Sequence, residues 1–547
     1  MKKIHGARAI VNCLEREGIE IVFGIPGLYN MPIFDALYHH PTIRVITVRH
    51  EQGAAFMADG YARATGKPAA ICTLPGPGLT NAMTGIGEAF YDSSPILILS
   101  TQVNRDFIDQ DRGLLHEMTG QFEMLEKLTK YGERITDGAD ISDVFRRAMK
   151  ALHSGRPRPV QIEIPRDIQV EMVPWSEDEE RHQQPSAPEL MVPCKEQIAT
   201  AAVTLAEAER PLIYAGGGVI ASDACDELVA LAERLGAPVL TTGMGIGAIP
   251  SDHQLWCGVP WIAGGANVAD VVAACDAFLA VGTRFNQGMT ADWSLPLPER
   301  TIRIDIDSEE IERNLPMQQK IVGDAKSVLA ALTSKLEDSG VDREGKVNPQ
   351  LAKAQEVFKA GLTAKMGQTE PWAKALRRTL PRNTILSCDM SLFWADMLSI
   401  FPIYEPRTML FPWGFGTLGF GLPEALGAKL GCPEKPVVAI VGDGALLFTG
   451  SELATAVQYN LNIPIIVPNN NAYGMIKVQQ RDQYDGQFMA VDLVNPDFVA
   501  LARAFGAYGV QATTSDELAI KLAEALTADK PTLIEIPWGW TWGAEKG

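Results

Sequence analysis

A Gly-Asp-Gly turn followed by an asparagine run is the strongest chemical signal in the sequence. Gly442-Asp443-Gly444 follows the apolar run 437–441, and Asn469-Asn470-Asn471 comes one predicted helix and one predicted strand later. A Gly-x-Gly turn between strand and helix exposes backbone N–H groups that suit a phosphate. A carboxylate at that turn would repel a bare anion, so a cation is expected between Asp443 and the phosphate. Asn470 can add a carbonyl oxygen, and an incomplete, oxygen-only ligand set favours Mg²⁺.

A second candidate for chemistry is Glu51. Residues 53–57, which follow it closely, are small or apolar, so its carboxyl is expected to be poorly solvated, which favours the protonated form. Such a group can exchange a proton with a bound ring nitrogen. The alternative is a surface glutamate that helps to cap a helix beside His50.

The helices and strands that must position these residues alternate regularly along the chain. Short apolar runs alternate with longer amphipathic helical patterns, which predicts parallel sheets covered by helices on both faces. The expected fold is α/β, with three doubly wound parallel-sheet domains. The predicted strands are 43–48, 69–73, 95–99, 160–164, 211–214, 278–281, 302–306, 384–387, 437–441, 464–467 and 532–536.

Two polar, proline-containing stretches without periodicity, 175–193 and 335–350, are predicted linkers. They delimit a first domain (1–174), a central domain (194–334) and a third domain (351–547). Segments 60–100 and 426–468 share the order helix, Lys-Pro, strand, Gly-x-Gly turn, helix, Pro and strand. The first and third domains are therefore predicted to be versions of one unit, although any two α/β units share part of this rhythm.

Composition excludes several classes of protein. A net charge of −19 over 547 residues gives no general attraction for nucleic acid or anionic lipid. The eight cysteines are widely spaced, without the pairs typical of zinc sites. No apolar run has membrane-spanning length, and the N-terminal residues lack a signal peptide's apolar stretch. We expect a soluble cytoplasmic protein without a nucleic-acid or membrane partner.

The motifs together resemble those of a known family. Gly442-Asp443-Gly444, followed some 25 residues later by Asn469-Asn470, resembles the diphosphate-binding motif of thiamine-diphosphate enzymes. RHEQGAAFMADGYARATGK (49–67) looks like the segment that holds that family's catalytic glutamate, and GTLGFGLPEALGA (416–428) resembles the stretch that grips the cofactor's aminopyrimidine. The similarity covers essentially the whole chain, in the order pyrimidine-binding domain, central Rossmann-like domain and diphosphate-binding domain. It is nearest to the acetolactate synthase, benzoylformate decarboxylase and 2-oxo acid decarboxylase branch.

The resemblance implies roles for particular residues. Asp443, Asn470 and the backbone carbonyl of Ala472 would ligate Mg²⁺, and Glu51 would share a proton with the pyrimidine N1′. The Gly416 carbonyl would accept from the 4′-amino group, and Leu418 would bend thiamine diphosphate into its V shape. The implied cofactor-binding set is Glu51, Ser391, Gly416, Leu418, Gly442, Asp443, Gly444, Ala445, Asn470, Ala472, Tyr473, Gly474 and Met475.

The residues that would contact the substrate are less well defined. His116, Glu117 and Gln121, in the segment RGLLHEMTGQ (112–121), are candidate catalytic proton handlers, although a lone histidine is as often structural. The predicted substrate wall is mostly apolar, and its members could equally be core residues. It consists of Leu28, Tyr29, Asn30, Trp413, Phe415, Met475 and Gln479.

The central domain is expected to lack FAD. Its Gly216-Gly217-Gly218 turn could hold a dinucleotide, as in the FAD-containing acetolactate synthases. The run 282–285 resembles part of that group's flavin region, but Asn286-Gln287 replaces the expected acidic pair.

The resemblance implies decarboxylation of a 2-oxo acid through an enamine intermediate, followed by carboligation to a second carbonyl. One alternative is a simple decarboxylase that releases an aldehyde. The run RGLLHE somewhat resembles enzymes acting on 5-guanidino-2-oxopentanoate, and Asp106, Asp109 and Asp111 could meet a guanidinium. A second alternative is a non-catalytic cofactor-binding homologue. The family also implies a homodimer or a dimer of dimers, with sites shared between subunits.

Overall fold

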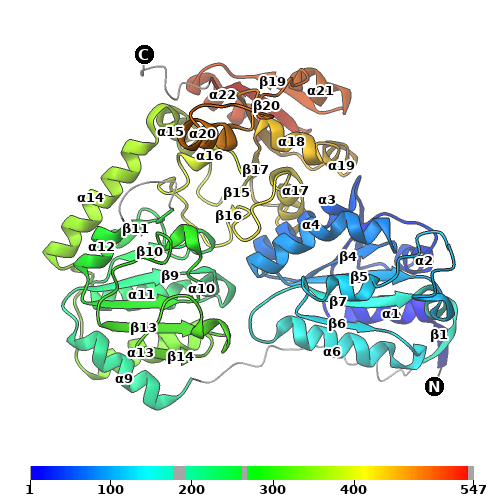
Figure 1. Ribbon diagram of the computed structural model, residues 1–547, viewed down its shortest axis with the longest axis horizontal. Helices are drawn as coiled ribbons and strands as arrows, with labels where there is room; N and C mark the ends of the chain where they lie inside the picture. The colour runs from blue at the N-terminus through cyan, green and yellow to red at the C-terminus, as the bar shows by residue number, and fades with distance from the viewer. Residues whose placement is uncertain (1, 176–192, 262–267, 540–547) are drawn as a thin grey trace.

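The computed structural model describes residues 2–175, 193–261 and 268–539. It contains three six-stranded sheets, one within each predicted domain, and helices cover their faces (Figure 1). This confirms the α/β class and the three parallel-sheet domains. All but one residue at each end of the predicted linker 175–193 lie outside the described residues. Among the described residues, no helix is long and apolar enough to cross a membrane.

The sheet of the first domain has the order β3-β2-β4-β5-β7-β6, with every neighbouring pair parallel. β4 and β5 are buried along their whole length, as expected for strands covered on both faces. The strands are β2 (Ile21–Gly24), β3 (Arg44–Thr47), β4 (Ala69–Thr73), β5 (Ile96–Gln102), β6 (Tyr131–Arg134) and β7 (Val160–Pro165). The helices include α1 (Gly6–Arg16), α2 (Met31–Tyr38), α3 (Glu51–Thr65), α4 (Pro77–Asp92), α5 (Gln121–Leu125), α6 (Ile141–His153) and α7 (Arg166–Val170). β1 (Lys2–His5) and β8 (Met172–Trp175) form a separate antiparallel pair.

The third domain repeats this topology, with the order β16-β15-β17-β18-β20-β19. Numbered within each domain, both sheets run 2-1-3-4-6-5, which confirms that the two domains are versions of one unit. The strands are β15 (Ile385–Cys388), β16 (Met409–Leu410), β17 (Val437–Ile440), β18 (Pro464–Asn469), β19 (Tyr508–Gln511) and β20 (Thr532–Pro537). The helices include α15 (Glu370–Thr379), α16 (Leu392–Ala395), α17 (Gly421–Gly431), α18 (Asp443–Thr449), α19 (Glu452–Gln458), α20 (Gly474–Gln483), α21 (Phe498–Ala504) and α22 (Ser515–Ala525).

The central sheet has the order β11-β10-β9-β12-β13-β14. Numbered within the domain this is 3-2-1-4-5-6, a doubly wound sheet whose direction of winding changes between β9 and β12. The strands are β9 (Pro211–Ala215), β10 (Val239–Thr241), β11 (Trp256–Gly258), β12 (Ala277–Val281), β13 (Arg300–Asp305) and β14 (Gln319–Val322). The helices include α9 (Lys195–Glu207), α10 (Gly217–Ala221), α11 (Cys225–Leu235), α12 (Val268–Ala274) and α13 (Ala325–Asp338), and α14 (Pro349–Lys365) leads to the third domain.

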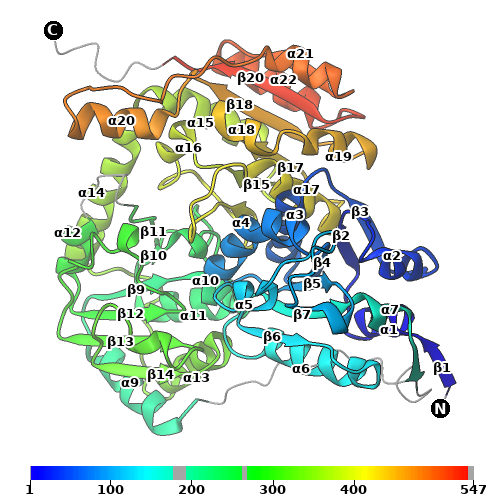
Figure 2. The same cartoon turned by 45° about the vertical axis from the view of Figure 1, so that its right-hand side comes forward.

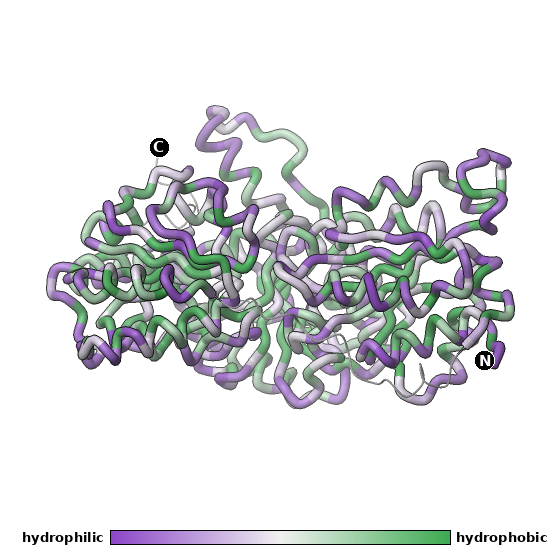
Figure 3. The backbone as a smooth tube through the Cα atoms, turned by 90° about the horizontal axis from the view of Figure 1, so that it is seen from below, coloured by the Kyte–Doolittle hydropathy of each residue, from purple (hydrophilic) through white to green (hydrophobic). Residues whose placement is uncertain are grey.

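The first and third domains meet along α3 and α17, which lie side by side (Figures 1 and 2). Two glycines allow the helix backbones to touch. A Cβ on Gly60 would lie 2.1 Å from the Glu424 carbonyl oxygen, and one on Gly427 would lie 2.0 Å from the Met57 carbonyl oxygen. One apolar core includes residues of both domains, and Figure 3 shows hydrophobic segments inside and hydrophilic residues on the surface. A side chain at either glycine would push the domains apart.

Candidate active site

The predicted diphosphate site lies at the carboxyl edge of the third-domain sheet. Gly442 caps α18, and Ser391 follows the adjacent strand β15 and caps α16, its hydroxyl accepting from Trp394 N at 3.3 Å. A Cβ on Gly442 would lie 3.2 Å from Ser391 Cβ, and one on Gly444 would lie 2.8 Å from the Tyr473 ring. The structure thus gathers these predicted cofactor residues around the start of α18, where backbone N–H groups can receive a phosphate.

Asp443 lies beside the asparagine loop, as the sequence predicted. Its carboxylate faces the backbone N–H groups of Gly444, Asn471 and Ala472. Burial raises the pKa of Asp443, and the hydrogen bond from Asn495, together with these N–H groups, opposes the rise. The Asn470 amide oxygen accepts from Ala472 N at 3.1 Å. The carboxylate, this amide oxygen and the Ala472 carbonyl form a donor set that suits a hard divalent cation. The described residues include no group of three or more His, Cys, Asp or Glu side chains able to hold a metal.

Asn495 ties this loop together and was not predicted. Its Nδ2 donates to Asp443 Oδ2 at 2.7 Å, to Asn469 Oδ1 at 3.1 Å and to Asn471 Oδ1 at 3.2 Å. The backbone pairing of Leu493 N with Asn471 O, at 2.8 Å, brings this segment to the loop. No sequence motif predicts Asn495, because a tertiary contact brings it to the asparagine loop.

Glu51 begins α3 and is buried, with 8% of its surface exposed. His50 is the N-cap, its Nδ1 accepting from Gln52 N at 3.2 Å. The alternative of a surface capping glutamate is therefore wrong. Asn81 Nδ2, on α4, donates to Glu51 Oε2 at 3.0 Å. Asn81 was also missed, although it follows Gly76-Pro77-Gly78, the first-domain counterpart of Gly442-Asp443-Gly444.

The segment that holds Gly416 crosses from the third domain onto α4. Gly416 has φ +71°, a left-handed conformation that favours glycine. The backbone N–H groups on either side of it, from Phe415 and Thr417, donate to the Glu88 carboxylate at 3.1 and 3.2 Å. Leu418 packs against the core shared by both domains. The Gly416 carbonyl therefore sits in a segment that the first domain fixes.

The loop containing His116 lies beside the Gly76 turn. His116 has φ +63°, and its ring packs edge-on against Tyr29 with centroids 6.0 Å apart. Gln121 is fully buried: its Oε1 accepts from Gly76 N at 2.9 Å, and its Nε2 donates to Thr101 O and Glu163 Oε1, both at 3.1 Å. These contacts use both ends of the Gln121 amide, which favours positioning of the turn over proton handling. His116 is half-buried, and its role as a proton handler stays a prediction.

The Glu117 side chain binds the backbone of its own loop. Its carboxylate accepts from Arg112 N at 3.1 Å and Leu114 N at 2.9 Å, and so closes the loop around His116.

The predicted substrate wall falls into separate regions of one chain. Asn30 is fully buried, and its amide bonds to Gly27 N and Ile25 O, which is a structural role. Trp413 packs against Gly243 of the central domain, where a Cβ would lie 2.1 Å from the indole. Gln479 is exposed on α20, far from α2, which follows Leu28 and Tyr29 (Figure 1). One chain alone therefore does not bring the predicted substrate wall together into a single pocket.

Comparisons with known proteins identify the family. The N-terminal TPP binding domain of thiamine pyrophosphate enzymes matches residues 4–124, the central domain matches 198–332 and the C-terminal TPP binding domain matches 390–536. The chain is a thiamine diphosphate enzyme.

Full-length relatives place the enzyme more closely. It is 37% identical to a probable acetolactate synthase large subunit of Methanocaldococcus jannaschii, over 97% of this chain and 91% of the relative. It is 36% identical to a probable 2-ketoarginine decarboxylase of Pseudomonas aeruginosa, over 98% and 94%. It is 33% identical to the acetolactate synthase isozyme 3 large subunit of Escherichia coli, over 96% and 93%. This thiamine diphosphate enzyme is therefore acetolactate synthase-like.

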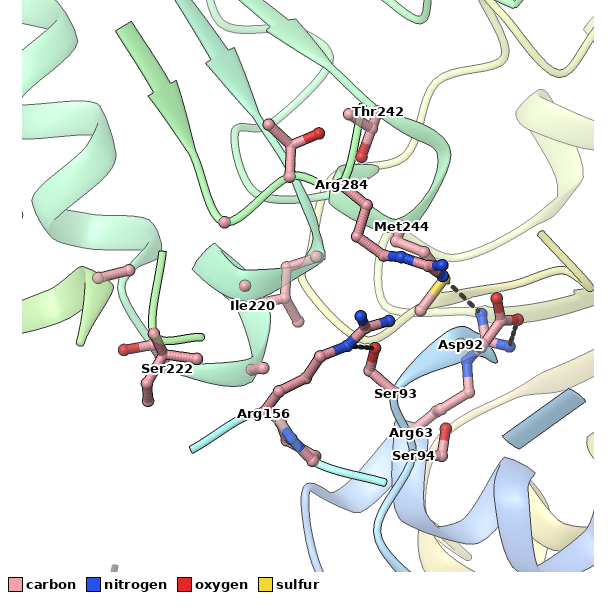
Figure 4. Close-up of a pocket in the computed structure, with 18 of the residues that line it drawn as sticks. Arg63, Asp92, Ser93, Ser94, Arg156, Ile220, Ser222, Thr242, Met244 and Arg284 are labelled. Atoms are coloured by element: carbon pink, nitrogen blue, oxygen red, sulfur yellow. Dashed lines mark hydrogen bonds and ion pairs between the residues drawn. The ribbon is translucent and has the colours of Figure 1, made fainter. Parts of the chain in front are cut away.

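The enzyme also has a cavity of about 490 Å³ where the first, central and third domains meet. It lies at the carboxyl edge of the central sheet, beside the winding change between β9 and β12, where such folds bind ligands. Figure 4 shows Arg156 and Arg284 converging in it from the first and central domains. Burial and the neighbouring Arg284 and Arg158 lower the pKa of Arg156 to about 9. Glu310 already pairs with Arg156, its Oε2 accepting from Arg156 Nη1 at 3.1 Å.

One wall of this cavity is aromatic. Trp413 forms part of the lining, and its indole also packs edge-on against Trp261 with centroids 5.5 Å apart. The same indole contacts Gly243, which follows β10.

Proposed function

We propose that this enzyme uses thiamine diphosphate and Mg²⁺ to decarboxylate a 2-oxo acid and then joins the product to a second carbonyl compound, as an acetolactate synthase does. Thiamine diphosphate, when bound, would supply the nucleophilic carbon and the electron sink that decarboxylation of a 2-oxo acid needs. The observation that carries the proposal is the burial of Glu51 against Asn81 in a chain that also keeps Asp443 beside Asn470 and Ala472.

The chain's own residues have defined tasks in this proposal. Asp443, Asn470 and the Ala472 carbonyl hold the metal, and the N–H groups at the start of α18 bind the diphosphate. Glu51 holds a proton against the pyrimidine N1′. Because the chain carries a net charge of −19, an anionic substrate depends on such local positive sites.

A simple decarboxylase is the second candidate, favoured by the similarity to the probable 2-ketoarginine decarboxylase. One of the three aspartates suggested for guanidinium binding gives this candidate little help. Asp109 Oδ1 accepts from Gly120 N at 2.9 Å, and its Oδ2 lies 3.9 Å from Arg134 Nη1, so this carboxylate is already engaged by the protein. A non-catalytic homologue is disfavoured because nothing in such a protein would require the buried Glu51.

The test is an assay of purified enzyme with thiamine diphosphate, Mg²⁺ and a panel of 2-oxo acids, following CO₂ and organic products together. We expect CO₂ release from pyruvate with formation of 2-acetolactate. Aldehyde as the main product, or activity confined to the guanidino oxo acid, would instead establish the simple decarboxylase. Absence of CO₂ from every oxo acid would refute both.

We further propose that the enzyme is a homodimer or a dimer of dimers whose sites combine the first domain of one subunit with the third domain of another. In one chain Glu51 bonds to Asn81 of the first domain, whereas Asp443 bonds to Asn495 of the third. Exposed apolar side chains near both regions give a second copy a surface to cover, among them Leu28, Leu115, Phe448 and Met489. A twofold interface would create two equivalent sites.

Mixing two inactive variants tests the shared site. Glu51→Gln and Asp443→Ala subunits, dissociated and reassociated, should regain activity, because half of the dimers would be mixed and each mixed dimer would hold one intact site. About a quarter of wild-type activity is expected for random mixing. Exchange of subunits, shown by mass spectrometry of differently tagged chains, without return of activity would place both residues in one chain's site.

The purified enzyme is expected to carry no flavin. The reason is Asn286-Gln287, which stands in place of the acidic pair. The absorbance spectrum of the native protein, and of the supernatant after heat denaturation, checks this. A flavin band in the supernatant would show that the central cavity accepts FAD after all.

A further inference from the structure

Two fully buried glutamates bind backbone N–H groups across the contact between the first and third domains. Glu88 lies on α4 of the first domain and accepts from the third domain. Glu452 begins α19 of the third domain and accepts from the first domain. Burying a carboxylate is costly unless hydrogen bonds replace its water. The segments that supply those hydrogen bonds therefore indicate what each glutamate holds.

Glu88 holds the segment around Gly416. Its two oxygens each accept one N–H, from Phe415 at 3.1 Å and from Thr417 at 3.2 Å, so the carboxylate brackets Gly416. The Phe415 ring stacks on Tyr91, one turn further along α4, at 5.5 Å and 9°. With both neighbours fixed, the left-handed Gly416 has little freedom to turn, and the direction of its carbonyl is set.

Glu452 holds the residues directly before Glu51. Its Oε1 accepts from Arg49 N and from His50 N, both at 3.0 Å, and its Oε2 accepts from the Thr455 hydroxyl at 2.6 Å. Gly53 makes the approach possible, because a Cβ there would lie 2.4 Å from Glu452 Oε1. The third domain therefore fixes the start of α3, and with it the backbone from which the Glu51 side chain extends.

The two contacts correspond under the internal duplication. In each domain, a glutamate after the Gly-x-Gly turn (76–78 or 442–444) accepts N–H groups from the segment that precedes the other domain's long helix. These helices are α17 and α3, the pair that packs through Gly60 and Gly427. In the proposed dimer these segments face different cofactors: the Gly416 carbonyl meets the amino group of one aminopyrimidine ring, and Glu51 meets N1′ of the other.

We infer that Glu88 and Glu452 are positioning residues, which hold the Gly416 carbonyl and the Glu51 carboxyl in the geometry that activates the cofactor; this rests on the proposed thiamine diphosphate site. Neither glutamate is expected to touch the cofactor. Each acts through the backbone segment that it binds.

The test compares Glu88→Gln and Glu452→Gln with a control variant, Glu17→Gln. Glu17 is another buried glutamate of the first domain, 4% exposed and paired with Arg16. In Glu88→Gln, the amide NH₂ replaces one acceptor and faces a backbone N–H donor. Two readouts respond to cofactor geometry rather than to folding: the thiamine diphosphate dissociation constant by calorimetry, and the rate of hydrogen–deuterium exchange at C2 of the bound cofactor by NMR.

We expect Glu88→Gln to weaken cofactor binding and slow C2 exchange, each roughly 10-fold or more, as for an unsatisfied buried donor. In Glu452→Gln one oxygen can still accept, so C2 exchange should slow by about 3- to 10-fold while affinity changes less. The control should match the wild type. If Glu88→Gln does not fold, Glu88→Asp, which keeps the charge but shortens the reach, takes its place with the same expected direction.

The outcomes separate the two proposals. Folded Glu88 and Glu452 variants with wild-type affinity and C2 exchange would overturn the positioning role while leaving the proposed function intact. A wild-type protein that binds no thiamine diphosphate would overturn the proposed function and, with it, this inference.

Discussion

Glu51→Gln is expected to retain thiamine diphosphate and to lose roughly 10²–10⁴-fold in turnover, the range of a general acid–base step. The amide is nearly the same size as the carboxyl, and its oxygen can still accept from Asn81 Nδ2, now at 3.0 Å from Glu51 Oε2. The site should therefore keep its shape. What disappears is the ability to hold and release a proton at the pyrimidine N1′.

Steady-state turnover and calorimetric cofactor binding, measured on the same preparation, check this prediction. Glu17→Gln again serves as the control for loss of a buried carboxylate elsewhere in the first domain. Asn81→Ala should produce an intermediate loss, since it removes the hydrogen bond to Glu51 but keeps the acid. More than half of the wild-type rate in Glu51→Gln would exclude the catalytic role.

The sequence predicted the parts of the fold that local patterns encode. Every predicted strand overlaps an observed one, for example 69–73 with β4 and 532–536 with β20. The strands it missed include β2, β6, β10 and β19. These are short, or at or near a sheet edge, and β6 and β19 are only partly buried, so they lack a long apolar run. Their pairing is decided by the sheet rather than by their own residues.

The residues of the candidate site also fall into those that local motifs predict and those that only tertiary contacts place. Asp443 and Asn470 were predictable because a sheet brings the carboxyl ends of adjacent strands to one edge, as β17 and β18 do here. Asn495, Glu88 and Glu452 were not, because each acts through a backbone or side-chain contact between segments distant in sequence. The substrate residues were least predictable, since in one chain they lie on separate regions and the proposed dimer would have to bring them together. Resemblance to the family identified the loops but not the contacts that hold them.

Asp443→Ala is expected to abolish retention of thiamine diphosphate. Asp443 supplies the only carboxylate of the proposed metal ligands, and without its charge the metal cannot bridge the chain to the diphosphate. The affinity loss should exceed the roughly 10–100-fold typical of residues that only support metal ligands. Alanine also removes the acceptor for Asn495 Nδ2 at 2.7 Å, so the loop would loosen at the same time.

Asp443→Asn separates the two effects. The asparagine oxygen can still accept from Asn495, which keeps the loop in place, but the negative charge is gone. If the carboxylate binds a cation, the asparagine variant should also lose the cofactor, and a large excess of Mg²⁺ should restore part of its binding, because mass action compensates a weakened site. If the carboxylate only holds the loop, Asp443→Asn should bind thiamine diphosphate almost as the wild type does, without any dependence on Mg²⁺. Calorimetric titration of both variants at several Mg²⁺ concentrations distinguishes these results. Wild-type affinity in Asp443→Ala would refute the metal site itself.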